Sequence, residues 1–236
     1  MLWEQFPEKL DLTDAIWCAN ADVVAKRLKE GHRVDWKAKR GVFPPMHHAA
    51  WKGHTAVLKI LLGAGADVES FDVQKHTALQ RAASGSHPAN TKLLLGAGAS
   101  VSETRGLGAP HWTTLHWAVS RWGESERKSA VAELLLDAGL DVNRPNKDET
   151  TLLRLAAKQG RLLFAKLLCC HGAKRSGDEA KLATGEAHAE LAAWLTETAD
   201  FTLEQHRERF PAYSVRTNVL EVDEQLPGDG SEVHTY

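Results

Sequence analysis

The chain of 236 residues has few cysteines and no long hydrophobic run. Its three cysteines, Cys18, Cys169 and Cys170, are odd in number and two are adjacent, so a disulfide framework is excluded and a reducing compartment is expected. No stretch approaches about 18 apolar residues, which predicts that no segment spans a membrane. The N-terminus has no basic segment followed by an apolar run, so we expect no secretory signal and a cytoplasmic location.

The chain also lacks a strong excess of charge of one sign. It has 29 Lys and Arg against 31 Asp and Glu, a formal net charge of -2, which gives no overall attraction to nucleic acid or to a membrane surface. A local basic run extends from Lys26 to Arg40. This run fits either an acidic partner or a solvated face, and we do not expect nucleic acid as a partner.

Signatures of catalysis and of metal binding are missing. There is no H-E-x-x-H, no paired C-x-x-C and no G-x-S-x-G. His47 and His48 are neighbours whose side chains diverge by about 100° on a helix, so they cannot both bind one ion. The Gly63-Ala64-Gly65 segment follows a predicted helix and not a strand, so it is no phosphate cradle. We therefore expect no enzyme, no catalytic residue, no cofactor or metal, and no small-molecule substrate.

The sequence does contain a repeat of 33 residues. Gly65-Ala66-Asp67-Val68 returns as Gly98-Ala99-Ser100-Val101, and Met46 returns as Leu79 with the same offset. A period in this range is typical of a solenoid, in which each unit buries its apolar face against its neighbours and the array presents a binding surface.

Each unit reads as two short helices. In the first clear unit, Met46, Ala49 and Ala50 share one helical face and Gly53 ends that helix. A second helix is predicted from about residue 55 to residue 62, before the glycines at 63 and 65. The predicted fold class is therefore all-α.

The units resemble the ankyrin repeat from about residue 12 to residue 197. The resemblance is carried by Met-His at 46–47, Thr-Ala-Leu at 77–79, Thr-Thr-Leu-His at 113–116, Gly-Leu-Asp-Val-Asn at 139–143 and Thr-Leu-Leu at 151–153. It implies an ankyrin-repeat solenoid of helix–turn–helix units with hairpin loops and a C-terminal extension. The implied divisions are an N-terminal capping repeat (1–40), four repeats (about 41–73, 74–106, 107–147 and 148–175), a C-terminal capping repeat (176–197) and an extension (198–236).

The resemblance also implies a protein partner that binds the concave face, formed by the hairpin tips and the ends of the first helices. The positions that it assigns to the partner are Phe43, Trp51, Lys52, Gln74, His76, Trp112, Arg121, Trp122, Lys147 and Lys158. Three of them are tryptophans, which are frequent hot spots of protein interfaces, although packing on neighbouring loops is the alternative role. The cations predict a basic rim that selects a partner with an acidic or mixed apolar surface. We assign Trp17, Trp36 and Trp194 to packing in caps and linkers.

Four histidines occupy positions with structural roles in this pattern. The resemblance implies that His47 and His116 bond to hairpin backbone, and that His54 and His87 close the first helices.

Beyond residue 198 the repeat stops. Thr202 and Gln205 fit a capping box, which predicts a short helix to about Phe210. The rest of the extension is acidic, and we expect it to be partly disordered. Three roles stay open: an adaptor, a dedicated inhibitor or immunity protein for one enzyme or toxin, and a structural subunit of a larger assembly docked through its tail.

Overall fold

The computed structural model describes residues 12–35, 43–101, 114–116, 126–146, 148–183 and 188–211. Within these ranges the secondary structure is helical and contains no strand. The helices with defined bounds are α1 (Leu12–Trp17), α2 (Ala21–Lys29), α3 (Pro45–Lys52), α4 (Thr55–Gly63), α5 (Ala78–Gly85), α6 (Pro88–Gly96), α8 (Glu126–Asp137), α9 (Leu152–Lys158), α10 (Leu162–Cys170), α11 (Glu179–Leu182), α12 (Ala189–Glu197) and α13 (Leu203–Arg209).

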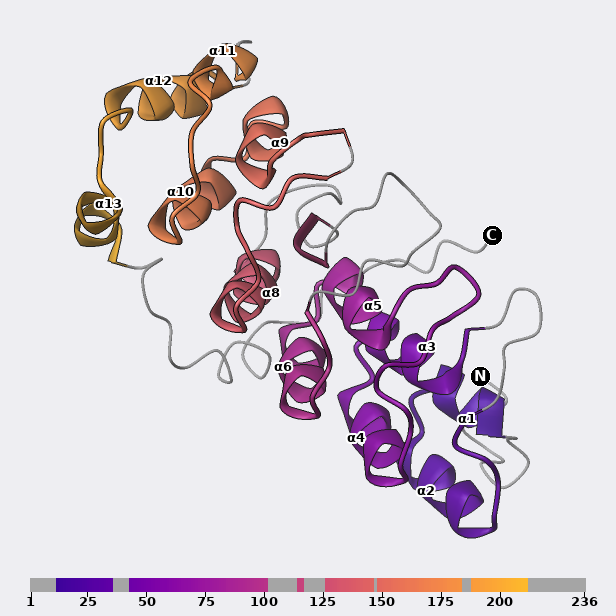
Figure 1. Cartoon of the computed structure of the whole chain (residues 1–236). Coiled ribbons are helices and arrows are strands. Elements are labelled where there is room, and N and C mark those ends of the chain that lie inside the picture. The colour runs from indigo at the N-terminus through magenta and orange to yellow at the C-terminus, as the bar shows by residue number, and fades with distance from the viewer. Residues whose placement is uncertain are drawn as a thin grey trace.

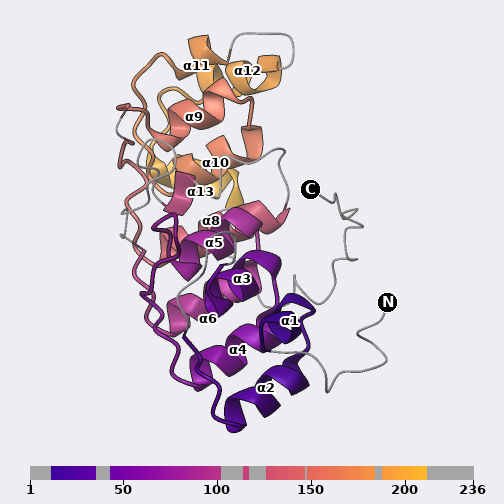
Figure 2. The same cartoon turned by 90° about the vertical axis from the view of Figure 1, so that its right-hand side faces the viewer.

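The helices stack as pairs along an elongated solenoid (Figure 1). The first helices of successive pairs pack side by side, α3 between α1 and α5, and the second helices form a parallel row in which α4 contacts α2 and α6. Figure 2 shows that the loops that join one pair to the next follow one side of this stack. The predicted all-α, ankyrin-type solenoid is confirmed.

The core lies between the two rows of helices. Alanine pairs at 49–50 and 82–83 are completely buried, and such small side chains allow α3 and α5 to approach closely. Leucines of the second helices fill the space behind them, and Leu58, Leu61 and Leu94 are completely buried. The predicted second helix at 55–62 is confirmed as α4.

Histidines connect the first three helix pairs. His54 Nδ1 lies 3.0 Å from the backbone oxygen of Ile16, and His87 Nε2 lies 2.9 Å from that of Trp51. His47 Nε2 lies 3.0 Å from the backbone oxygens of both Ser70 and His76 in the following loop. His47 thus bonds to loop backbone as predicted. The backbone N–H groups of His54 and His87 donate to the backbone oxygens of Ala49 and Ala82 and close α3 and α5 as predicted, and the ring bonds to the preceding pair are an addition.

The start of the C-terminal extension continues as ordered structure. Thr202 and Gln205 form both hydrogen bonds of the predicted capping box, and α13 follows directly. The helix packs on α10, where Arg207 Nε donates to the backbone oxygen of Cys170 at 3.0 Å. The remainder of the extension, including the acidic segment for which disorder is predicted, lies outside the described residues.

Arg175 holds this end of the solenoid together, and we predict that its removal destabilises the chain. Its guanidinium donates to the backbone oxygen of Leu195 at 2.8 Å and to Thr198 Oγ1 at 2.7 Å. Since hydrogen bonds from a charged donor are worth more than neutral ones, Arg175→Ala should lower the free energy of unfolding by about 2 kcal/mol in a urea titration followed by circular dichroism. The neighbouring Lys174 has an exposed side chain, so Lys174→Ala should have little effect; equal effects of the two variants would contradict this role.

Candidate binding surface

Six of the ten residues predicted to contact a partner lie in the described structure. They are Phe43, Trp51, Lys52, Gln74, His76 and Lys158. The other four, Trp112, Arg121, Trp122 and Lys147, lie outside the described residues.

Phe43, Trp51 and Lys52 form one cluster. Trp51 is the penultimate residue of α3, and its half-buried ring lies 5.8 Å from the ring of Phe43, measured between centroids. The Lys52 ammonium lies 4.5 Å from the centroid of the Trp51 ring, at the range of a cation–π contact. The structure therefore brings three of the predicted residues together at the start and end of one helix.

Gln74 joins this cluster through Arg81 of α5. The guanidinium carbon of Arg81 lies 4.5 Å from the Phe43 ring centroid, and Arg81 Nη2 donates to Gln74 Oε1 at 2.6 Å. Arg81 was missed by sequence reasoning, because its position on the first helix of a unit does not reveal that it reaches back to the preceding unit. It connects the α3 cluster to the loop between α4 and α5.

The buried Asp72 fixes the conformation of the loop between α4 and α5. Its buried carboxylate accepts hydrogen bonds from the backbone N–H groups of Gln74 at 2.8 Å and His76 at 3.0 Å, and from Arg81 Nε at 2.6 Å. Burial alone would raise the pKa of Asp72, but the hydrogen bonds from His76 and the Arg81 guanidinium outweigh burial and hold this pKa well below its usual range. The loop is thus organised around a carboxylate that is ionised at pH 7.

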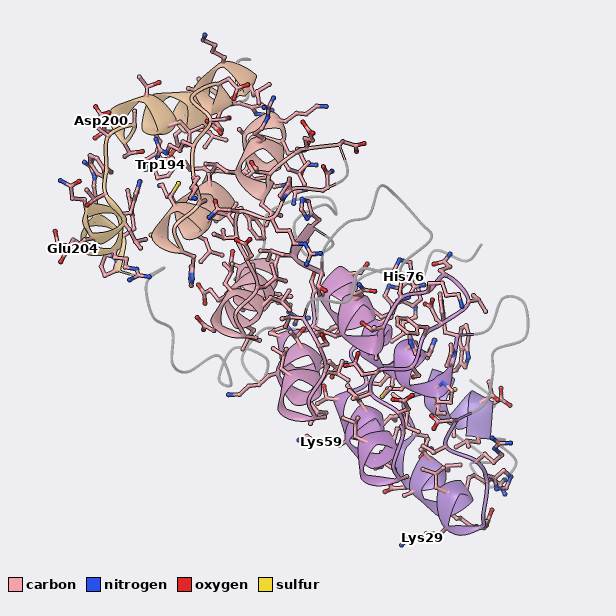
Figure 3. The ribbon with its side chains drawn as sticks, viewed as in Figure 1. Lys29, Lys59, His76, Trp194, Asp200 and Glu204 are labelled. Atoms are coloured by element: carbon pink, nitrogen blue, oxygen red, sulfur yellow. The ribbon has the colours of Figure 1, made fainter. Side chains whose placement is uncertain are left out.

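His76 does not lie on the surface where the prediction placed it. Its side chain is buried, with 4% exposed, in the loop that leads into α5 (Figure 3). The imidazole Nδ1 lies 3.7 Å from Asp72 Oδ1, and this contact with the carboxylate turns the ring inward. The exposed tip of the loop is made instead by Val73, Gln74 and Lys75. We therefore remove His76 from the candidate surface.

Lys158 is exposed at the end of α9, far along the solenoid from α3 (Figure 1). Lys158 therefore does not lie next to Trp51. The loop before α9 repeats the geometry seen at Asp72: Asn146 Oδ1 accepts from the backbone N–H groups of Asp148 at 3.0 Å and Thr150 at 2.8 Å. The residues on either side of Lys147 thus belong to a loop with the same hydrogen-bond pattern as the loop around Asp72.

Trp17, which the sequence interpretation assigns to packing in a cap, both packs on the next helix pair and is exposed. It ends α1, its side chain is 48% exposed, and its ring stacks on His48 with centroids 4.2 Å apart. The sequence does contain a signal for this position, because Trp17 precedes Trp51 by 34 residues, close to the repeat length. Trp17 therefore presents an exposed ring surface next to Trp51 and Phe43 in addition to its packing on His48.

His48 lies between the two tryptophans. Its side chain is buried, and its ring centroid is 6.5 Å from that of Trp51. Burial, together with the nearby His54 and Lys52, lowers the pKa of His48 to about 4, so the imidazole is neutral at pH 7. Trp17, His48, Trp51 and Phe43 thus form a continuous row of neutral rings, which we call the aromatic stripe.

Two further features of the described residues bear on what the surface can do. They include no group of three His, Cys, Asp or Glu side chains placed to hold a metal ion. None of their helices is both long and apolar enough to cross a membrane.

Comparisons with known proteins agree with the repeat. Residues 12–105 match the family model for ankyrin repeats in three copies. The chain is 36% identical over 115 residues to ankyrin repeat and SOCS box protein 11 of Danio rerio, an alignment that covers 49% of this chain and 36% of that protein. The chain thus spans about a third of the length of this curated relative.

A solved structure shows the same fold. The ankyrin repeat domain of human ASB11 superposes with a TM-score of 0.69 at 23% sequence identity, covering 82% of this chain and 85% of that domain.

Proposed function

We propose, from the premise that this chain is an ankyrin-repeat protein, that it acts as a non-catalytic recognition module whose concave side binds a protein partner. Ankyrin repeats are protein–protein interaction modules, so partner binding follows from the family. The particular face and the particular partner are our proposal.

The observation that carries the proposal is the way Trp51 is held. Its backbone oxygen bonds to His87 of the next unit at 2.9 Å, while its half-buried ring lies between Phe43 and the Lys52 ammonium. A tryptophan fixed in this way loses little conformational entropy on binding, and such residues are frequent hot spots. Trp51 is therefore the proposed central anchor.

The charges around Trp51 favour a partner with an acidic or mixed apolar surface. Lys52 is exposed, and among the residues that the structure describes no carboxylate forms an ion pair with it. We propose that the surface continues along the solenoid through Lys158 and through the predicted positions Trp112, Arg121, Trp122 and Lys147. The three cysteines are free thiols, which fits the proposed cytoplasmic location.

The test is partner capture followed by an affinity measurement. The purified chain is used as bait in a lysate of its source cells, and the captured protein is then titrated against wild type and Trp51→Ala by calorimetry. Loss of a central tryptophan should weaken binding by about 30-fold or more, corresponding to roughly 2 kcal/mol. Leu163→Ala, which removes a side chain of α10 that is 36% exposed, is the matched control and should bind like wild type.

The same experiment separates the roles that the sequence leaves open. A dedicated inhibitor should retain one partner with a Kd below about 1 nM, whereas an adaptor should bind several partners near 1 μM. A subunit docked through its tail should be insensitive to Trp51→Ala. An unchanged affinity of this folded variant would therefore contradict binding through Trp51.

A further inference from the structure

We infer that Trp17 is a second anchor of the same surface, and that the aromatic stripe binds an acidic protein segment that also carries a large apolar side chain. This inference rests on the proposed function and specifies its partner. It extends the surface onto the first helix pair, which the sequence pattern presents only as a cap.

The stripe is continuous from α1 to α5. Trp17 stacks on His48 at 4.2 Å, and His48 meets Trp51 edge-on at 6.5 Å between centroids. Trp51 lies 5.8 Å from Phe43, whose ring is covered by Arg81 at 4.5 Å. Because His48 is completely buried, the rings that a ligand can reach are Trp17 on one side of it and Trp51 with Phe43 on the other.

The two tryptophans lie at the ends of the first helices of adjacent pairs, and a histidine of the following pair bonds to the backbone at or beside each of them. The backbone oxygen next to Trp17, that of Ile16, is bonded by His54, and the backbone oxygen of Trp51 is bonded by His87. Each bond comes from the histidine at the start of the second helix in the following pair. The backbone beside Trp17 is thus held by His54, while Trp17 itself is 48% exposed.

Exposed large apolar side chains lie at both ends of the described structure, and only at this end does one of them stack in a row of rings. Among the described residues, the large hydrophobic side chains that are exposed are Trp17, Val73, Leu163 and Leu203. Of these, Trp17 lies in the row of first helices, and Val73 lies in the loop that Arg81 links to the aromatic stripe. An exposed tryptophan beside other rings marks an interaction site more often than a single exposed leucine does.

The charges indicate which end of the stripe receives carboxylates. Lys52 and Lys75 are exposed at the Trp51 end, and the nearby Asp72 is buried and paired with Arg81. At the other end, Asp14 is exposed on α1, three residues before Trp17. The fitting segment therefore places its acids near Lys52 and its apolar side chain near Trp17.

The same contacts disfavour two other ligands. Lys52 and Arg81 already cover ring faces of Trp51 and Phe43, so these faces are not free for a cationic ligand or for stacked bases. A nucleic-acid strand also needs several cations along its phosphates, and this surface offers few. An acidic polypeptide uses the existing cations without displacing them.

The test selects peptides without assuming a partner. A random 12-residue peptide library displayed on phage is panned on the immobilised full-length chain, and the enriched peptides are synthesised and titrated by fluorescence anisotropy. The enriched peptides should carry net negative charge and at least one Trp, Phe or Leu. Trp17→Ala and Lys52→Glu should each weaken their binding about tenfold or more, with a larger Lys52→Glu effect at low salt.

Controls separate binding from folding. Trp17→Phe keeps a ring on His48 and should retain most of the affinity, whereas Leu203→Ala, a change on α13 at the other end of the chain, should leave it unchanged. Circular dichroism and Tm of each variant show whether it is folded. If Trp17→Ala proves unfolded, the peptide affinities of Trp17→Phe and Trp17→Leu are compared instead. A weaker affinity of Trp17→Leu then shows that binding needs an aromatic ring at this position.

The possible failures are distinguishable. Peptides that depend on Trp51 but not on Trp17 would overturn this inference and leave the proposed function standing. Peptides that depend on Trp17 but carry no excess of acids would overturn the partner chemistry. Peptides that depend on neither tryptophan would count against both proposals. Displacement of the selected peptides by a tighter-binding synthetic peptide of residues 212–236 would show that the acidic segment belongs to this chain and not to a partner.

Discussion

Gly53→Ala is expected to lower the free energy of unfolding by about 3 kcal/mol. Gly53 ends α3 with a φ of 77°, a conformation that costs an alanine roughly 1 kcal/mol or more. A Cβ at this position would also lie 2.5 Å from His87 Nδ1, so the imidazole would have to move. That movement breaks the bond between His87 and the backbone oxygen of Trp51 and leaves polar groups unsatisfied.

Gly65→Ala is the matched control for this effect. Gly65 has a φ of 84°, and nothing lies within 4 Å of an added Cβ. The control should therefore show the backbone cost alone, about 1 kcal/mol, in the same urea titration. Equal destabilisation by the two substitutions would contradict the role of His87 as the link between neighbouring pairs. If the link is real, Gly53→Ala should also weaken partner binding, because it releases the backbone that fixes Trp51.

Acid is expected to destabilise the solenoid strongly between pH 6.5 and about 4. Burial lowers the pKa values of His47, His48, His54 and His116, those of His48 and His116 to about 4. In the unfolded chain these groups bind protons near pH 6.5, so the unfolded state binds more protons than the folded state throughout this interval. The stabilisation is therefore complete above pH 6.5 and is lost as the pH falls toward 4.

Calorimetry at a series of pH values measures this effect. The Tm should fall by about 10 °C or more between pH 7 and pH 4.5, and His48→Phe, which keeps a ring against Trp17, should make the fall shallower. His32→Gln removes an exposed histidine and should leave the slope unchanged. A Tm that stays constant over this interval would show that the buried histidines accept protons without a cost in stability.

Much of the fold follows from the sequence because the signals are local. Two helices per unit, glycines after them and a period of 33 residues fix the backbone of a solenoid, and helix α4 begins at the residue predicted. The capping box at Thr202 specifies α13 in the same local way. The grouping of Phe43, Trp51 and Lys52 also follows, since the loop before a first helix and the end of that helix lie at fixed places in a unit.

The rest of the candidate surface depends on contacts between units, which the repeat pattern does not contain. His76 turns inward because Asp72 is buried beneath its loop, Arg81 reaches back to Phe43 of the preceding unit, and Trp17 stays exposed on top of His48. The sequence by itself therefore determined the solenoid and its period, and it predicted which positions a partner would contact. Only the tertiary structure decided which of those side chains point outward, because the direction and burial of a side chain depend on what the neighbouring unit packs against it.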